Sequence, residues 1–360
     1  MNPLQLNMVE GDFHMAILNL TELNGEAAVL YKFLKDKIIS QEEAIKEVCN
    51  LVQKAFVDLC PEEKPLGIFF FAGPTGTGKT KIVHDIASYF NTKPLTINCG
   101  EFQSSYDIAK LVGSPPGYIG HTETKPLFSK ERIEQEGKPT VILLDEIEKA
   151  SPAFFNIMLG IFDKASLSTG DNTNVDFSTS FIFMTSNIGI NNIEDKKSKF
   201  GFHEINVTDA HKNSSIQAAM KKKFSPEFLN RLDKTIVFNT LTQDNCRQIL
   251  DLELFEIQNR MSNSEEKKIM FIISDSAKDQ LIKVGYSEEY GARYMKRALE
   301  TNVVNPLSNA LSHPDVNEND IIFVDYINSE FQFDKKKRVM KAGSSRMGFK
   351  MQDIIIPIQS

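Results

Sequence analysis

Eight consecutive residues have the spacing of a phosphate-binding loop, G-x-x-x-x-G-K-[ST]. The residues are Gly73, Pro74, Thr75, Gly76, Thr77, Gly78, Lys79 and Thr80. An apolar run over residues 66–72 precedes them and a helical pattern over residues 79–89 follows, which favours this motif over a glycine-rich turn. Backbone N–H groups in such a loop, together with the helix N-terminus, attract phosphate oxygens. We therefore expect Lys79 to contact the β- and γ-phosphates of a nucleotide, and Thr80 to hold Mg²⁺.

A second apolar run ends in two acidic residues. Residues 141–144 are all apolar, and Asp145 and Glu146 follow directly. The carboxyl ends of parallel strands lie at one edge of a sheet, so these carboxylates would lie beside the phosphate loop. There Asp145 can hold Mg²⁺ and Glu146 can act as the general base on the attacking water. Asn187 ends another apolar run and could orient that water, although a capping Asn in a turn explains it equally well.

Local sequence patterns do not determine the roles of two arginines. Arg231 follows an apolar helical face and precedes the last predicted strand, and alone it suits a surface Arg–Asp pair worth less than about 1 kcal/mol. Arg293 follows Gly291 and Ala292 at the predicted start of a long helix over residues 291–311. A positive charge there opposes the helix dipole, which indicates a task elsewhere, such as pairing with phosphate.

The elements that must position these residues alternate between strand and helix, which is typical of a parallel sheet with helices on both faces. Strands are expected at residues 66–72, 94–98, 140–144, 180–185 and 235–238. Their nearly continuous apolar content suits burial on both sides. Ser40 is expected to cap a helix that ends near residue 57. The predicted fold class is α/β, with five parallel strands between helices.

The pattern changes after the last predicted strand. From residue 241 onward helices dominate, with one short apolar strand at residues 270–273 and closing strands within residues 321–333. We expect an N-terminal extension (1–29), a large α/β domain (30–239), a small and mostly helical domain (240–333), and a tail (334–360) with a basic start and an apolar end.

Composition excludes several classes of protein. The 360 residues are 41% hydrophobic and 25% charged, as in globular proteins, and the net charge of −7 disfavours a nucleic-acid groove. The first twenty residues lack the basic start of a signal peptide, and no apolar run approaches the ~20 residues of a membrane span. We expect a cytoplasmic protein without nucleic-acid or membrane partners.

Four cysteines lack C-x-x-C spacing, which predicts reduced thiols and no zinc site: Cys49, Cys60, Cys99 and Cys246.

The order of these blocks resembles the AAA+ ATPases of the Clp unfoldase family, and specifically their second ATPase ring. The resemblance covers residues 30–330 and is carried by GPTGTGKT, GSPPGYIG, LLDEIEKASPAFFNIML, FIFMTSN, FSPEFLNRLD and YGARYMKRAL. It implies an AAA+ P-loop domain followed by a small lid domain, with ATP and Mg²⁺ as cofactors. Lys79 and Thr80 correspond to the Walker A pair, and Asp145 and Glu146 to the Walker B pair.

The resemblance also implies roles that local patterns leave open. Asn187 resembles sensor 1. Arg231 resembles the arginine finger that reaches the nucleotide of a neighbouring subunit, and Arg293 resembles sensor 2 on the lid domain. Ile38 and Ile39 resemble the apolar residues around adenine.

Two further segments resemble contact sites of the family. Tyr118 and Ile119 lie in a loop with two prolines and three glycines, and resemble the pore loop whose aromatic side chain grips a substrate polypeptide. Phe200, Gly201 and Phe202 stand in a polar segment where family members that feed the peptidase ClpP carry an apolar–Gly–apolar tripeptide. An apolar tripeptide in so polar a segment suits a docking site, or a loop that tucks against its own domain.

The chain departs from the family pattern in several places. We expect no first ATPase ring, no N-domain repeat and no coiled-coil middle domain, and hence a single-ring protein. Residues 124–126 stand where the family has Gly-Gly after the pore loop, and residues 172–173 where it has Gly-Arg in a second pore loop. Ser40 replaces a usual Gly. These changes leave the nucleotide site intact and alter the pore.

The leading hypothesis is an ATP-driven homo-oligomeric ring, a hexamer, that unfolds or remodels protein substrates by threading them through a central pore. A ClpP-like peptidase is a further expected partner. A nucleic-acid remodeller of the clamp-loader type is disfavoured, because it needs a basic channel and the chain is acidic. A non-translocating interaction module, or a stand-alone chaperone or disaggregase, remains the alternative.

Overall fold

The computed structural model describes residues 23–57, 59–114, 126–188, 209–263, 269–287, 291–318 and 320–336, with only the backbone for residues 209–214 and 336. The pore-loop residues Tyr118 and Ile119 lie outside the described residues. So do the three residues of the predicted docking tripeptide, most of the expected extension and most of the tail. Within the described ranges, none of the helices is long and apolar enough to cross a membrane.

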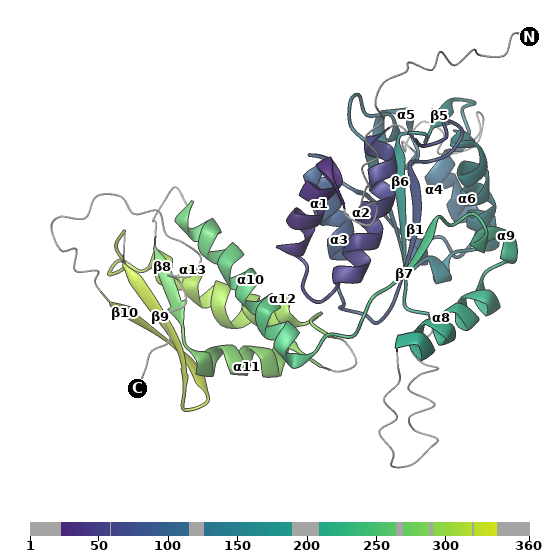
Figure 1. Cartoon of the computed structure of the whole chain (residues 1–360). Helices are drawn as coiled ribbons and strands as arrows, with labels where there is room; N and C mark the ends of the chain where they lie inside the picture. Colours follow the sequence, from purple (N-terminus) through teal and green to yellow (C-terminus); the bar gives the residue numbers. More distant parts are fainter. Residues whose placement is uncertain are drawn as a thin grey trace, which may run out of the picture.

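A five-stranded parallel sheet forms the centre of the larger part, in the order β2-β3-β6-β1-β7 (Figure 1). The predicted α/β fold class is therefore confirmed, and each predicted strand is present with its ends shifted by no more than one residue. Its strands are β1 (Gly67–Ala72), β2 (Leu95–Asn98), β3 (Thr140–Asp145), β6 (Ser180–Ser186) and β7 (Lys234–Val237). All residues of β1 and β6 are buried, which explains their continuous apolar runs.

Helices cover both faces of this sheet, and alternate residues of each strand face different layers. In β1, Phe69 and Phe71 pack with the helices before and after the strand, whereas Ile68 and Phe70 pack with the later helices. The first layer contains α1 (Gly25–Lys35), α2 (Glu42–Phe56) and α3 (Lys79–Tyr89). The second contains α4 (Ala109–Val112), α5 (Lys130–Ile133), α6 (Pro152–Lys164), α8 (Asp209–Lys223) and α9 (Pro226–Leu229). A short hairpin of β4 (Ser166–Ser168) and β5 (Asn174–Asp176) follows α6.

The start of α2 differs from the prediction. Ser40 does not cap this helix, because its backbone has a φ of 63°, in the left-handed region. Gln41 precedes the helix instead, and its side chain binds the chain after β7: Nε2 donates to the Asn239 carbonyl (2.9 Å), and Oε1 accepts from the Asn239 N–H (3.0 Å). A glycine adopts this φ without strain, so the serine carries a small conformational cost here.

The C-terminal part, from residue 241 onward, lies beside the five-stranded sheet and its helices in Figure 1 and has an apolar core of its own. A three-stranded sheet in the order β10-β9-β8 packs beside its helices. The first residue of this core is Leu241, and the domain boundary at residue 240 stays a prediction. The elements are α10 (Gln243–Ser262), β8 (Met270–Ile273), α11 (Asp275–Gly285), α12 (Met295–Leu299), a π-helical turn (Glu300–Val304), α13 (Asn305–Ser312), β9 (Ile321–Ile327) and β10 (Glu330–Lys336).

The long helix predicted over residues 291–311 begins later than expected. Gly291 and Ser287 form an isolated bridge, and α12 starts only at Met295. Arg293 therefore lies in the turn before the helix, and the predicted conflict with the dipole of the first helical turn was wrong. The π-helical turn lies directly before Pro306, whose missing N–H cannot continue a regular α-helical ladder.

Candidate nucleotide-binding site

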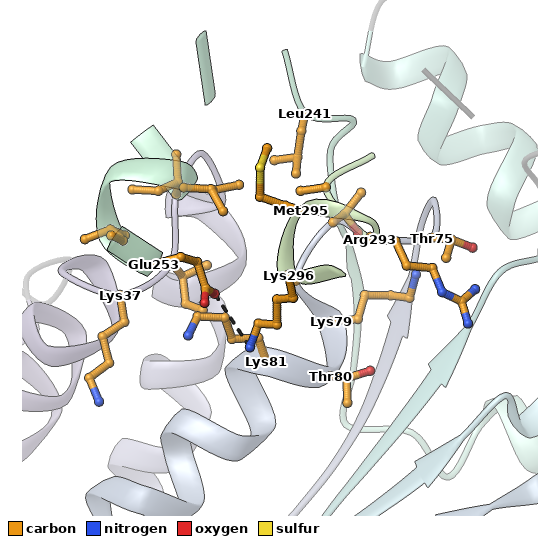
Figure 2. Close-up of a pocket in the computed structure, with 18 of the residues that line it drawn as sticks. Lys37, Thr75, Lys79, Thr80, Lys81, Leu241, Glu253, Arg293, Met295 and Lys296 are labelled. Carbon is orange, nitrogen blue, oxygen red and sulfur yellow. Dashed lines mark ion pairs between the residues drawn. The ribbon is translucent and has the colours of Figure 1, made fainter. Parts of the chain in front are cut away.

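A pocket of about 870 Å³ lies between the carboxyl edge of the five-stranded sheet and the C-terminal part. Twelve of the predicted site residues line it, although they come from five segments of the chain. Figure 2 shows Thr75, Lys79 and Thr80 of the phosphate loop together with Arg293 from the turn before α12. The twelve are Ile38, Ile39, Thr75, Gly76, Thr77, Gly78, Lys79, Thr80, Asp145, Glu146, Asn187 and Arg293.

Lys79 is the central cation of this pocket, although only 7% of its surface is exposed. Its ammonium donates to the carbonyls of Gly73 and Pro74 (both 2.7 Å) and to Oδ1 of Asn187 (3.0 Å). Gly73 and Pro74 do not line the pocket and contact Lys79 through their backbone carbonyls. The acceptors of these three hydrogen bonds are uncharged, so a phosphate oxygen would give the buried ammonium an anionic partner. Gly78, with a φ of 99°, directly precedes α3 and lets the loop enter the helix.

Burial lowers the pKa of Lys79 to about 8, and the negative charge of Asp145 only partly opposes this effect. A bound phosphate favours the charged ammonium, so the pKa of Lys79 is higher in the nucleotide complex than in the free protein. The free protein loses this proton above pH 8 while the complex keeps it. Nucleotide affinity is therefore expected to be full below about pH 8 and to fall as the pH rises further, with proton uptake on binding.

Isothermal titration of ADP in two buffers of different ionisation enthalpy, at about pH 8.5, measures this uptake. We expect roughly 0.5 to 1 proton per bound nucleotide. Identical heats in the two buffers would show that Lys79 is already fully charged in the free protein.

The two acidic residues lie at the end of β3 with different surroundings. The Thr185 hydroxyl donates a hydrogen bond to Oδ1 of Asp145. Glu146 has a left-handed backbone (φ 55°), and its carboxylate accepts from the Lys149 ammonium at 2.6 Å. Asp145 and Thr80 thus offer the oxygen ligands that Mg²⁺ prefers. Among the described residues, no cluster of three or more His, Cys, Asp or Glu could hold a metal by itself.

Gly291 is a site residue whose contact the sequence analysis missed. A Cβ atom on Gly291 would lie 3.1 Å from the Thr75 carbonyl and 3.2 Å from the Gly76 carbonyl, and its φ of 54° is also in the left-handed region. The turn therefore packs directly on the phosphate loop. This contact carries Arg293 into the pocket, and in Figure 2 its side chain extends toward the side where Thr75 and Lys79 lie. The only signal in the sequence is the glycine two residues before Arg293.

The other end of the pocket is apolar and joins both parts of the chain. Ile38 and Ile39 come from the segment between α1 and α2, and Leu241, Ile249 and Met295 come from the C-terminal part. Such a surface can enclose a planar base. Sequence patterns did not identify the last three residues, because apolar residues at helical spacing look like ordinary core.

Arg231 is not among the residues that line the pocket. Its guanidinium makes a two-point contact with Asp163 on α6: Nε donates to Oδ1, and Nη2 donates to Oδ2 at 3.1 Å. The guanidinium lowers the pKa of the Asp163 carboxyl. About a third of the Arg231 side chain is exposed, so the surface pair that the sequence left open is present in the single chain.

Comparison with known proteins identifies the family. A family model described as "AAA domain (Cdc48 subfamily)" matches residues 64–235, and one described as "C-terminal, D2-small domain, of ClpB protein" matches residues 241–324. The chain is 36% identical over 282 residues to the chaperone protein ClpB of Vibrio vulnificus (strain YJ016), covering 77% of this chain and 31% of that protein.

It is also 36% identical over 310 residues to the ATP-dependent Clp protease ATP-binding subunit ClpC of Staphylococcus aureus (strain USA300), covering 84% of this chain and 37% of that one. A cryo-electron microscopy structure of closed-state Hsp104 with ATPγS and FITC casein is similar, with a TM-score of 0.70 and 27% identity, covering 86% of this chain and 51% of that chain. The chain thus spans about a third of the length of these curated relatives. With both matched segments in the same order and around one nucleotide-sized pocket, the chain belongs to the AAA+ ATPases of the Clp family.

Proposed function

We propose that this chain forms a homohexameric ring that uses ATP and Mg²⁺ to thread and remodel protein substrates. The observation that carries the proposal is the composite pocket. Its phosphate end belongs to the α/β part, while Arg293 and much of the apolar end belong to the C-terminal part. Nucleotide turnover at such a site changes the contacts that hold the two parts together, and this is how chemistry can drive movement.

The pocket residues divide the chemistry among themselves. Lys79 binds the β- and γ-phosphates, while Arg293 brings a second positive charge from the other part of the chain. Glu146 accepts a proton from water as the water oxygen attacks the γ-phosphorus, and the bond to the β–γ bridging oxygen breaks, so that ADP and phosphate leave. Mg²⁺, held through Thr80 and Asp145, supplies charge neutralisation at the phosphates when bound. Asn187 accepts a hydrogen bond from the ammonium of Lys79, and so connects Lys79 to the carboxyl edge of the sheet, where the water is activated.

The proposal for Glu146 includes one movement: its carboxylate leaves the Lys149 ammonium before it accepts the proton. The ion pair at 2.6 Å holds the carboxylate on the turn that follows β3. One carboxylate oxygen is occupied by the Lys149 ammonium, so the side chain must turn from Lys149 to reach the attacking water.

The threading part of the proposal is tested by substitution of the pore-loop aromatic. Tyr118→Ala is expected to leave basal ATPase within about twofold of wild type and to lower the unfolding rate of a fluorescent folded substrate by at least about tenfold, because an aromatic anchor supplies much of the contact energy with an extended chain. The measurements are phosphate release and loss of substrate fluorescence in ATP.

Tyr106→Ala is the matched control. Tyr106 is 90% exposed on the same β2–β3 connection, and it is not among the pocket residues. This variant should unfold substrate at the wild-type rate. Unfolding that survives Tyr118→Ala would favour the alternative, in which the ATPase assembles and presents a surface without translocation.

A ClpP-type peptidase partner belongs to the same proposal and is tested by adding that peptidase to the same assay. The similarity to ClpC, named as the ATP-binding subunit of a Clp protease, supports it. Phe200→Ser with Phe202→Ser should abolish degradation and spare unfolding. Degradation that persists in this double variant would remove the tripeptide from the proposal.

We also propose a cytoplasmic location, which suits four cysteines that form no disulfide.

A further inference from the structure

Thr185 is a buried polar residue that local patterns did not single out. It lies in β6, and the parallel register that pairs Leu144 with Met184 brings it beside the end of β3. Its exposed fraction is only 2%, although it lines the pocket. A buried hydroxyl must find hydrogen-bond partners, and its partners here are the two acidic residues of the site.

One hydroxyl group holds both of these residues. It donates to Oδ1 of Asp145 and accepts from the N–H of Glu146 at 3.1 Å. Glu146 follows the last residue of β3 with a left-handed backbone, so its N–H does not continue the ladder of the sheet. Thr185 satisfies this N–H and fixes the orientation of the neighbouring carboxylate. A valine would fill the same space but leave both polar groups without this partner.

The same strand end also connects to the phosphate loop. Asn187, two residues after Thr185, accepts a hydrogen bond from Lys79, and its own N–H donates to Oε1 of Glu148 at 3.2 Å. The end of β6 therefore joins Lys79, which would face the phosphates, with the carboxylates that would face Mg²⁺ and water. The hydroxyl occupies one acceptor site of the Asp145 carboxylate, which retains further acceptor sites that would face the hydration shell of an ion.

We propose that Thr185 is a positioning residue that sets the Asp145 carboxylate and the Glu146 backbone relative to each other, and thereby adjusts both Mg²⁺ affinity and hydrolysis. The proposal rests on the proposed roles of Asp145 and Glu146. Partners that orient a metal-binding carboxylate typically change metal affinity or activity by about 10–100-fold when removed.

Thr185→Val tests this role with a readout besides turnover. The Mg²⁺ concentration that half-saturates binding of a fluorescent ADP analogue is expected to rise about tenfold, and kcat to fall about 10–100-fold. Affinity for the same analogue in EDTA should stay within about twofold of wild type, because the contacts of Lys79 do not change. Thr185→Ser keeps the hydroxyl and should retain the wild-type Mg²⁺ dependence.

Thr140→Val is a matched control for the loss of a buried hydroxyl. Thr140 is 1% exposed at the opposite end of β3, and its hydroxyl donates to the Ile133 carbonyl at 2.6 Å, outside the pocket. This variant should lower the melting temperature and leave the Mg²⁺ dependence unchanged.

The proposal is overturned if Thr185→Val behaves as Thr140→Val does, or if it loses nucleotide binding in EDTA to the same extent as in Mg²⁺. If Thr185→Val does not fold, a shifted Mg²⁺ dependence in Thr185→Ser overturns it instead. Glu146→Gln measured in parallel distinguishes failure of the proposed catalytic role of Glu146 from failure of the proposed positioning role of Thr185. Wild-type hydrolysis in that variant removes the assigned base, whereas a Mg²⁺ effect confined to Thr185→Val concerns positioning alone.

Discussion

Glu146→Gln is expected to lower kcat for ATP hydrolysis by about 10²–10⁴-fold, with nucleotide affinity within about twofold of wild type. Glutamine has the size of glutamate but cannot accept the proton of the attacking water. The Glu146 carboxylate pairs with Lys149, and of the three acidic residues that act on the pKa of Lys79 it has the smallest effect, so the ground-state binding of nucleotide depends little on it. Phosphate release and titration with a fluorescent nucleotide measure the two quantities separately.

Lys79→Ala provides the opposite pattern. The ammonium of Lys79 holds two carbonyls of the phosphate loop and Asn187, and it faces the phosphates before any chemistry occurs. Its loss should therefore abolish nucleotide binding.

Glu134→Gln is the matched carboxylate control for Glu146→Gln, since Glu134 accepts a hydrogen bond from the Asp176 N–H and does not line the pocket. Hydrolysis at the wild-type rate in Glu146→Gln would falsify the assignment of the base.

Arg231→Ala is expected to bind ATP normally and to lower kcat by about 10³-fold or more, which is the range for an arginine supplied to a neighbour's phosphates. The arginine does not line its own pocket, and its guanidinium is held at the surface by Asp163. An arginine held at the surface of one subunit can enter the site of the next subunit in a ring. Steady-state hydrolysis and nucleotide titration again separate the two effects.

Two further measurements distinguish a role in trans from a surface ion pair. Asp163→Asn weakens the pair and keeps the arginine, so it should retain most of the activity that Arg231→Ala loses. Mixing Arg231→Ala subunits with Lys79→Ala subunits should restore some hydrolysis, because intact sites form at half of the mixed interfaces. If demonstrably mixed rings show no recovery at any ratio, Arg231 does not act on a neighbour.

Arg247→Ala is the matched control for the loss of a surface arginine. Arg247 also makes a two-point contact with carboxylates, at 2.6 Å from Asp275 and 2.7 Å from Asp279. It lies in the C-terminal part and does not line the pocket. Surface pairs of this kind contribute little to stability, so this variant should hydrolyse ATP as the wild type does.

Local sequence patterns were sufficient for the central sheet and for the residues at its carboxyl edge. A strand buried on both faces must be apolar along its whole length, as β1 and β6 are, and such runs can be recognised without knowledge of their neighbours. The phosphate loop directly follows β1, and Asp145 and Glu146 follow the apolar run of β3. Because the strands are parallel, their carboxyl ends meet at one edge, and the predicted cluster there follows from topology alone.

Patterns at the ends of helices were less informative. Ser40 has the composition of a helix cap, yet its backbone is left-handed, and the side chain of Gln41 binds Asn239 across 198 residues of sequence. The start of α12 was also placed too early, because the turn at Gly291 packs on the phosphate loop before the helix begins. In both cases a contact with a distant segment decides the local conformation.

Only the tertiary structure identified the partners of the site residues. The hydroxyl of Thr185 reaches Asp145, 40 residues earlier, and Arg231 reaches Asp163, 68 residues earlier. Such pairs depend on which strands become neighbours and in what register, and a buried threonine in a strand has the same local pattern whether or not its hydroxyl has a function. The sequence by itself thus determined the sheet, the phosphate loop and the acidic pair, because each is encoded over a few consecutive residues. The packing of β6 against β3, and of the C-terminal turn on the phosphate loop, decided which other side chains complete the site.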